Sequence, residues 1–319
     1  MEPLTHRPKK HLEWNESYYY VFYDLKNKIG GMTRIGFKPN KNEGMTFFFL
    51  FLPDGSAAGH QAFAKVENHT KFQKFEVGSV VHEPQPDGKW KYRFKGQMYV
   101  VKNPEDMPKI RENRKLISYI APVTMEVEFS PINEVYEYSK HMTPTSREIG
   151  KSGDAHWEQI GVTNGKIRFG DKNFEIRDCM TQRDHTHGVR DWTGIGNWLY
   201  YVVWFSKNLA INPAAIITED GRIATGGFMF KNGKNIPIKS INVLEQKFRN
   251  EIYPVSSKLE IIDAYGETHI LEGKAGPIIP IPFVDSEGRK AVLTQSFGEF
   301  KLDDIEGGYG TFETLRIKR

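Results

Sequence analysis

Apolar and polar residues alternate along much of the chain. In residues 89–96, Trp90, Tyr92 and Phe94 alternate with lysine and arginine, and residues 123–129 repeat the pattern. Successive side chains of a β-strand point to opposite faces, so this period of two predicts strands with one buried face and one solvated face. The pattern therefore predicts a protein built mainly from β-strands.

Short turn motifs separate many of these strands. Each contains glycine after aspartate, asparagine or glutamate, a combination typical of tight hairpins. They occupy residues 53–56, 86–89, 163–166, 219–222, 231–234 and 286–289. Helical signals are scarce: Ser130 and Pro131 could cap and begin one short helix, and residues 103–115 could hold one or two turns. We expect an all-β, antiparallel fold with few short helices.

Eight candidate strands follow Trp192 in close succession. They are residues 197–205, 212–218, 222–230, 236–248, 258–265, 277–284, 290–302 and 309–317. Eight strands are enough to close a small barrel. The first 190 residues hold a comparable number. We therefore predict two β domains, residues 1–190 and residues 191–319, packed against each other.

Composition narrows the class of protein. The net charge of +4 comes from 44 basic and 40 acidic residues that are interspersed along the chain, and the basic clusters at residues 7–11 and 109–115 are too short to indicate a nucleic-acid partner. A single cysteine, Cys179, excludes an intrachain disulfide framework. The first residues lack the apolar core of a secretory signal, and no window approaches 18 apolar residues. We expect a cytoplasmic protein without an integral membrane segment, and a homodimer is left open.

Residues 180–205 bring together the main candidates for catalytic, metal-binding and ligand-binding side chains. This segment, MTQRDHTHGVRDWTGIGNWLYYVVWF, combines two arginine–aspartate pairs and two histidines with a run of aromatic residues. A solvated loop would not need the aromatics, and a core strand would not tolerate the charges. An active site, a metal site and a salt-bridged structural corner all remain open on this pattern.

The segment at residues 156–192 resembles the signature of the AttH-like and carotenoid 1,2-hydratase-like (hydroxyneurosporene synthase) superfamily. In that family Glu-Gln and a glycine-bearing hairpin precede Asp-His-x-Trp-Gly and an aromatic strand. Residues 14–40 and 307–317 also resemble the ends of a little-characterised bacterial branch. The resemblance implies two lipocalin-like, calycin-type β-barrels with a lipophilic ligand pocket near their junction. The chain departs from the family at His187, where tryptophan is common.

Hydratases and cyclases of this kind begin by protonating an alkene, and the resemblance therefore implies acid–base catalysis. We hypothesise that Asp184 is the acid or tunes it, and that His185 is its proton partner. Adjacent residues of an extended strand point to opposite faces, so the two line one pocket only if the backbone bends. Glu158 would assist. In the structural alternative, Asp184 pairs with Arg183 or Arg190, and His185 donates to a backbone carbonyl.

We expect the remaining candidate residues either to fix the loop of the site or to contact the bound ligand. We expect Arg190 and Asp191 to orient the loop as a bidentate ion pair. The expected contacts to a hydrophobic small-molecule substrate are His187, Trp192, Trp198, Tyr200, Trp204 and His60.

Besides an active site and a structural corner, a metal site is the third interpretation of residues 156–192. His185 and His187 share a strand face and could be two ligands, with Glu158, His156 or Asp191 as a third. Two ligands do not make a site, so we predict neither a metal nor another cofactor.

The resulting hypothesis is an acid–base enzyme acting on a terpenoid or polyketide-like molecule. The reaction would be hydration, dehydration, isomerisation or cyclisation. The alternative is a non-catalytic carrier of a hydrophobic ligand.

Overall fold

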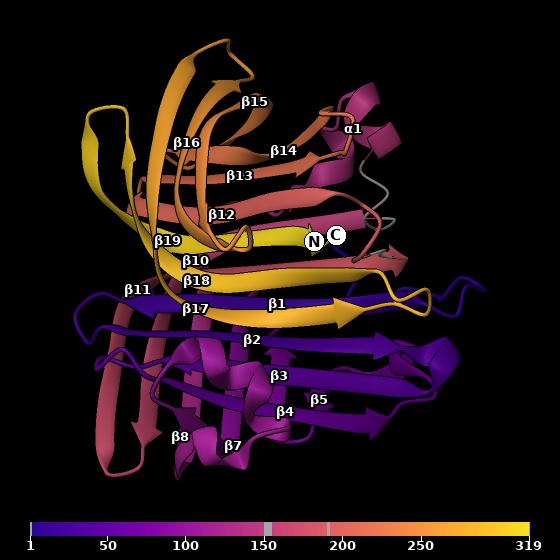
Figure 1. Ribbon diagram of the computed structural model, residues 1–319, viewed down its shortest axis with the longest axis vertical. Coiled ribbons are helices and arrows are strands. Elements are labelled where there is room, and N and C mark those ends of the chain that lie inside the picture. Colours follow the sequence, from indigo (N-terminus) through magenta and orange to yellow (C-terminus); the bar gives the residue numbers. More distant parts are fainter. Residues whose placement is uncertain (1, 150–154, 190–191, 319) are drawn as a thin grey trace. The chain divides into compact units, whose positions relative to one another are not determined.

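The computed structural model describes residues 2–149, 155–189 and 192–318, and the chain forms two compact units (Figure 1). Unit 1 comprises residues 1–135 and 153–190, and unit 2 comprises residues 136–152 and 191–319. Almost all regular structure is antiparallel strand, with one short α-helix and five 3₁₀-helices among the described residues. The predicted all-β fold is confirmed.

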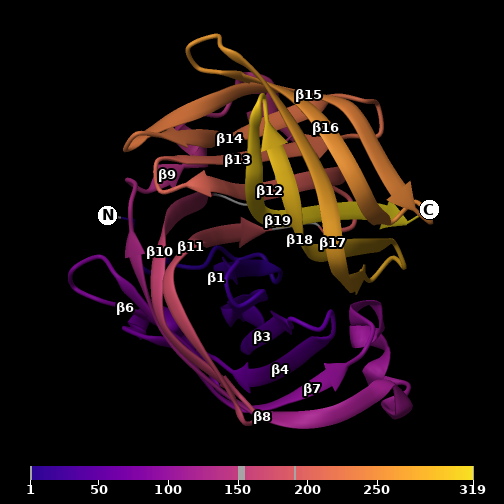
Figure 2. The same ribbon diagram turned by 90° about the vertical axis from the view of Figure 1, so that its left-hand side faces the viewer.

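Unit 1 is an antiparallel sheet in the order β4-β3-β2-β1-β11-β10-β8-β7-β6-β5. Its strands are β1 (Trp14–Asp24), β2 (Ile29–Lys38), β3 (Glu43–Phe51), β4 (Ala57–Lys65), β5 (Phe75–Val77), β6 (Val80–Pro84), β7 (Trp90–Val101), β8 (Ile117–Pro131), β10 (Ala155–Phe169) and β11 (Lys172–Val189). Its 3₁₀-helices are η1 (Pro39–Lys41), η2 (His69–Lys71), η3 (Pro104–Arg111) and η4 (Arg114–Leu116). A further pairing of β4 with β7 joins the two ends of an eight-strand run, so the sheet closes on itself (Figure 2).

Aromatic rings fill the inner face of this sheet. Tyr20 of β1 and Tyr92 of β7 are fully buried and stack with ring centroids 3.8 Å apart. Phe22 and Phe94, two positions further along their strands, belong to the same core. Each such ring contributes roughly 2 kcal/mol through its burial. The alternation seen in the sequence therefore reports which face of each strand is buried.

Unit 2 is a closed barrel of eight antiparallel strands, β12 to β19. The strands are β12 (Asn197–Ser206), β13 (Leu209–Ile217), β14 (Ile223–Lys231), β15 (Lys234–Arg249), β16 (Tyr253–Asp263), β17 (Thr268–Val284), β18 (Lys290–Leu302) and β19 (Ile305–Lys318). Each corresponds to one of the eight predicted strands. The unit also contains β9 (Tyr136–Glu137), η5 (Tyr138–Lys140) and α1 (Pro144–Ile149).

The turn predicted at residues 163–166 is wrong. β10 continues through Asn164 and Gly165 with only a register shift there, and the hairpin turns at residues 170–171. Gly165 instead allows β10 and β8 to approach each other closely, because a Cβ at this position would lie 2.2 Å from the carbonyl oxygen of Glu126 on β8. Glu158 consequently lies opposite Asp184 rather than opposite Asp171, where a turn at residues 163–166 would have placed it.

Two helical expectations have different outcomes. The helix expected from Ser130 and Pro131 is wrong, because both residues end β8 by pairing with β10. The turns expected in residues 103–115 are present as η3 and η4. α1 was not predicted, although Thr143 followed by a proline is a usual signal for the start of a helix. The Thr143 side chain accepts a hydrogen bond from the backbone of Ser146 (3.1 Å), and Pro144 is the first helical residue.

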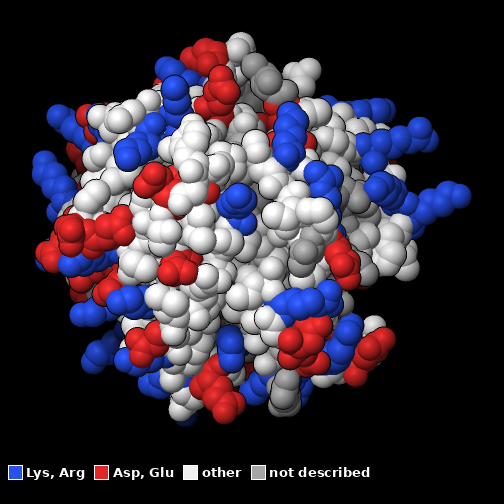
Figure 3. All heavy atoms as spheres, turned by 90° about the horizontal axis from the view of Figure 1, so that it is seen from above, with Lys and Arg blue, Asp and Glu red and all other residues white. Residues whose placement is uncertain are grey.

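The surface carries mixed charge. Basic and acidic side chains are interspersed over the face shown in Figure 3, in keeping with the nearly balanced composition. Within the described part of the chain, no helix combines the length and the apolar character needed to cross a membrane.

The backbone at Gly227 should not tolerate a side chain. Its φ is +107°, and a Cβ would lie 1.8 Å from the carbonyl oxygen of Asn212 on the neighbouring strand. We expect Gly227→Ala to lower the free energy of unfolding by about 3 kcal/mol in urea titrations. Gly288→Ala is the control, because its φ of +79° is also positive but its Cβ would meet nothing within 4 Å. Equal losses for both variants would contradict the role of the close contact.

His82 should make the stability of the protein depend on pH. It is fully buried in unit 1, and burial lowers its pKa from 6.5 to about 3. Between these values the unfolded chain binds a proton that the folded chain does not, so stability falls as the pH drops below 6.5.

We expect His82→Gln to reduce this loss by about 2 kcal/mol between about pH 7.5 and about pH 5, measured by urea unfolding. His11→Gln, at an exposed position, should leave the loss unchanged. A wild-type pH dependence in His82→Gln would show that this histidine is not the source.

Candidate functional site

The pairing of β1 with β11 determines which side chains share the inner face of unit 1. Tyr20 lies opposite Arg183, Tyr18 opposite His185, and Glu16 opposite His187. Residues directly opposite each other in an antiparallel pair point to the same side of the sheet. Because Tyr18 and Tyr20 belong to the core, Glu16, Arg183, His185 and His187 point inward with them.

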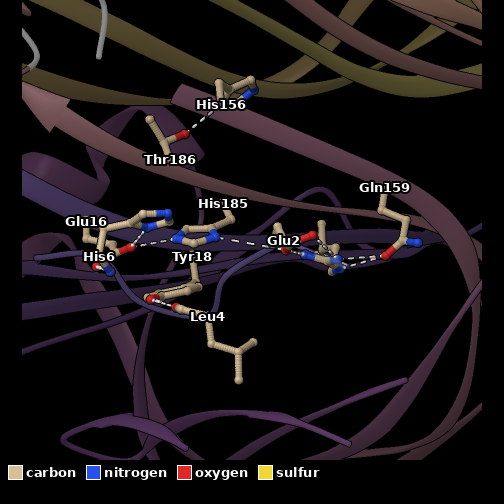
Figure 4. Close-up of polar contacts among 10 residues, drawn as sticks. Glu2, Leu4, His6, Glu16, Tyr18, His156, Gln159, His185 and Thr186 are labelled. Atoms are coloured by element: carbon tan, nitrogen blue, oxygen red, sulfur yellow. Dashed lines mark hydrogen bonds and ion pairs between the residues drawn. The ribbon is translucent and has the colours of Figure 1, made fainter. Parts of the chain in front are cut away.

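The carboxylate of Glu16 is the centre of a buried histidine cluster (Figure 4). His6 Nδ1 lies 2.6 Å and His185 Nε2 lies 2.9 Å from Glu16 Oε1. His69 Nε2 bonds the other oxygen, Oε2, which also accepts the backbone N–H of His6 at 3.0 Å. Glu16 therefore accepts hydrogen bonds from three imidazoles that come from distant parts of the chain.

Local structure positions the two histidines that lie outside the sheet. His69 begins η2, whose N-cap Asn68 accepts a hydrogen bond from the backbone of Thr70. The segment before β1 is fixed by the Tyr18 hydroxyl, which donates to the carbonyl of Leu4. His6 is thereby held beside Glu16, near the start of β1, and its side chain is 21% exposed.

A buried ion pair lies next to the cluster. Arg183 donates from Nη1 to Glu2 Oε1 at 2.5 Å and from Nη2 to Glu2 Oε2 at 3.1 Å. The same guanidinium donates to Gln159 Oε1 at 2.7 Å and lies 5.0 Å from the ring centroid of Trp90. Glu2 Oε1 lies 3.9 Å from His185 Nδ1, so the ion pair adjoins the cluster (Figure 4).

Aromatic rings surround these polar groups. His185 stacks on Tyr18 with centroids 4.5 Å apart, and Trp157 lies 5.1 Å from His185. His187 stacks on His6 at 3.9 Å. The environment is therefore one of low polarity, in which each electrostatic interaction is stronger than it would be in water.

The protonation states follow from burial and contacts. Burial opposes the ionisation of Glu16, but the hydrogen bonds from His185 and the other two histidines outweigh it and hold its pKa far below the usual range. Burial likewise opposes the ionisation of Glu2, and Arg183 more than offsets it, so the pKa of Glu2 is also lowered. Burial lowers the pKa of His185 despite the nearby carboxylates. Near neutral pH, Glu16 is therefore a carboxylate and His185 a neutral donor.

Asp184 and Glu158 point to the opposite face of the sheet from His185. They lie opposite each other on β11 and β10. Glu158 is fully buried, and its Oε1 accepts a hydrogen bond from His156 Nε2 at 2.6 Å, while His156 Nδ1 lies 2.5 Å from the hydroxyl of Thr186. Figure 4 shows His156 and Thr186 apart from the row formed by Glu16, His185 and Glu2. The proposed acid and its proton partner thus lie on different faces, and Arg183 pairs with Glu2.

The other predicted site residues are dispersed. Arg190 and Asp191 lie outside the described residues. His60 is on β4, with Nδ1 3.2 Å from the carbonyl of Gln97. Its imidazole ring is partly buried, which lowers its pKa.

The four aromatic candidates belong to unit 2. Trp192 stacks on Phe283 with centroids 4.7 Å apart, and Trp198 Nε1 donates to Glu313. Along β12, Tyr200 and Trp204 alternate with the core residues Leu199, Tyr201 and Val203. Trp198, Tyr200 and Trp204 therefore point to the opposite face of that strand from the main core of unit 2.

Four residues of this region were not predicted from the sequence: Glu16, His6, His69 and Glu2. Arg183 was predicted only as an ion-pair partner of Asp184. A signal existed for Glu16, because it lies two positions before Tyr18 and is therefore in phase with the inward residues of β1. No pattern in the sequence relates His69 or His6 to this strand.

The chain matches the model of one protein family, the Domain of unknown function (DUF7064), over residues 2–318, and it belongs to that family. Among curated proteins no relative matches the sequence. A putative AttH from Nitrosomonas europaea has the same fold, with a TM-score of 0.62 and 11% identity over 95% of this chain and 92% of that one. Kievitone hydratase from Nectria haematococca gives a TM-score of 0.56 and 10% identity over 94% and 87%. The expected AttH-like fold is confirmed.

The ion pair of Glu2 with Arg183 should contribute strongly to stability. We expect Glu2→Ala to lower the free energy of unfolding by about 3 kcal/mol, because it leaves a buried guanidinium without its carboxylate. A double-mutant cycle with Arg183→Met should give a loss smaller than the sum of the single losses. Glu13→Ala removes a half-exposed glutamate bound to Lys38 and Lys41, and it should cost at most about 1 kcal/mol. Additive losses at Glu2 and Arg183 would contradict the coupling.

Proposed function

We propose that this protein is an acid–base enzyme that adds water to a lipophilic small molecule or removes it, and that the histidine cluster around Glu16 is its working site. The observation that carries the proposal is a buried carboxylate bonded to three imidazoles inside an aromatic barrel. The fold shared with kievitone hydratase supports a hydratase over the isomerase or cyclase alternatives, as an analogy of fold.

The cluster has the parts that reversible hydration requires. In the hydration direction, a base takes one proton from water, the water oxygen bonds to one carbon of a double bond, and the other carbon receives a proton. One water molecule is consumed in total, and dehydration is the reverse. The imidazoles can take a proton from water and return one to the substrate, and Glu16, which stays a carboxylate, orients them and stabilises the imidazolium that forms.

Each surrounding residue has a separate part in the proposal. His185 is the one predicted catalytic residue that lies in the cluster, and we propose it as the proton partner of Glu16 in place of Asp184. His6 reaches solvent and would face an entering substrate. Glu2, Arg183 and Gln159 would act as positioning residues, because their hydrogen bonds fix the neighbours of His185 without contacting Glu16.

Labelled water tests the hydratase directly. Purified protein is incubated in ¹⁸O-water with kievitone and, separately, with the organic-solvent extract of the protein itself, and the products are analysed by mass spectrometry. We expect a product heavier by one labelled water, or lighter by one water, with wild type, and a rate at least about 100-fold lower with Glu16→Gln. Glu13→Gln, three positions away and outside the cluster, should retain the wild-type rate.

The carrier alternative predicts a different result. A lipophilic molecule that co-purifies with the protein and returns chemically unaltered, with no labelled product from any probe, would contradict the enzyme and favour the carrier. A labelled product formed equally fast by Glu16→Gln would contradict the assignment of the site.

A further inference from the structure

Ligand-type atoms of three side chains converge at one place in unit 1. His6, Glu16 and His185 each present one nitrogen or oxygen atom, and these three atoms lie within 4.8 Å of one another. His69 is not part of this set, because its Nε2 contacts the second oxygen of Glu16. Two imidazole nitrogens and one carboxylate oxygen therefore surround a single position.

We propose that His6, Glu16 and His185 bind a divalent first-row transition-metal ion. Neutral imidazole and carboxylate are the ligands that Zn²⁺ and its neighbours take in proteins, and a set of three leaves one position of a tetrahedral ion open. Metal–nitrogen and metal–oxygen bonds of about 2 Å place neighbouring ligand atoms of a tetrahedron about 3.3 Å apart. Glu16 Oε1 now lies 2.6 Å from His6 Nδ1 and 2.9 Å from His185 Nε2, so the ligand atoms need to move apart by less than about 1 Å to admit the ion.

The charge of the cluster favours a cation. Glu16 has no exposed surface, and within the described structure its ion-pair partners are the three histidines, with no lysine or arginine among them. A buried carboxylate is costly unless a positive charge or several hydrogen bonds compensate it. A bound metal ion supplies that charge at the point where the histidines already meet.

The surroundings are those of a metal site. A histidine ligand usually directs its second ring nitrogen toward a carboxylate or carbonyl, which orients the ring. His185 Nδ1 lies 3.9 Å from Glu2 Oε1, and Glu2 is held in turn by Arg183. A metal site would therefore explain why the ion pair of Glu2 and Arg183 is buried next to the cluster.

Access to the cluster comes from one side. The side chains of Glu16, His69 and His185 are at most 1% exposed, whereas that of His6 is 21% exposed. Glu16 and His185 are thus fixed inside the unit, and the third ligand, His6, lies where an ion can enter. The set differs from the pair of His185 and His187 suggested by the sequence, and it excludes His156 and Glu158, which face the other way.

Metal content of the intact protein is the primary test. The full chain is purified without a histidine tag or chelator, and elemental analysis should find about one divalent transition-metal ion per chain. After removal of metal with EDTA, one equivalent of Zn²⁺ should bind in native mass spectrometry and raise the unfolding temperature by several degrees. Protein that binds no Zn²⁺ under these conditions contradicts the proposal.

Matched variants locate the ion. Glu16→Gln and His185→Gln should each weaken Zn²⁺ binding at least tenfold, and His6→Ala, at the more exposed position, should do so with the least risk to folding. Glu13→Gln and His82→Gln replace the same residue types outside the cluster and should bind as wild type does. Binding that survives in all three ligand variants would place the ion elsewhere and overturn the assignment.

A measurement on wild type covers the case in which buried variants fail to fold. X-ray absorption of the Zn²⁺-loaded protein should show only nitrogen and oxygen ligands, with the outer-shell scattering of about two imidazoles. A water-rich shell without imidazole scattering would indicate an adventitious ion only and would contradict the site.

The inference rests on the proposed function in treating this cluster as the working site, but its test reads metal rather than turnover. Protein that adds labelled water and binds no metal would contradict the metal site alone. Protein that binds the metal and leaves every probe unaltered would contradict the proposed hydratase alone.

Discussion

The register of β1 against β11 is the constraint on which the candidate site depends. It places Tyr18 opposite His185 and Tyr20 opposite Arg183, and so brings Arg183 and His185 to the same side as the core. A slip of one residue would turn every side chain of a strand to the other face. Glu16 would then leave the interior, and the three histidines would have no common partner.

The interior of unit 1 combines two requirements that usually conflict. Stacked rings such as those of Tyr20 and Tyr92 make an apolar core, yet Glu16 and the pair of Glu2 with Arg183 carry charge into it. A buried ion pair is often less stabilising than apolar residues of the same volume. Stability alone does not explain such groups, whereas strong electrostatics at a dry site are what acid–base and metal chemistry use.

The fold could be predicted from the sequence because it depends on local patterns. Alternation of residues along each strand and glycine-bearing turns predicted all eight strands of unit 2. The main error in unit 1 has a physical cause: Asn164 and Gly165 look like a hairpin, but Gly165 is required for contact with a third strand, which no local pattern reveals.

The site could be predicted only in part, for a related reason. Alternation already separates Asp184 from His185, and the inward phase of β1 would have marked Glu16. His6 reaches the cluster through the irregular segment before β1, and His69 through a 3₁₀ turn. Neither segment has a period that fixes its direction, so their contacts follow from tertiary structure alone.

The order in which the chain is made gives the pairing of β1 with β11 a further consequence. Glu16 and His185 are 169 positions apart, and Glu2 and Arg183 are 181 apart. β1 is therefore synthesised long before its partner strand, and residues 136–152, which belong to unit 2, emerge between them. Contacts of such long range close slowly during folding. One edge of β1 therefore stays unpaired in the nascent chain until β11 emerges, and the charge of Glu16 on this mostly aromatic strand opposes its pairing with another chain in the meantime.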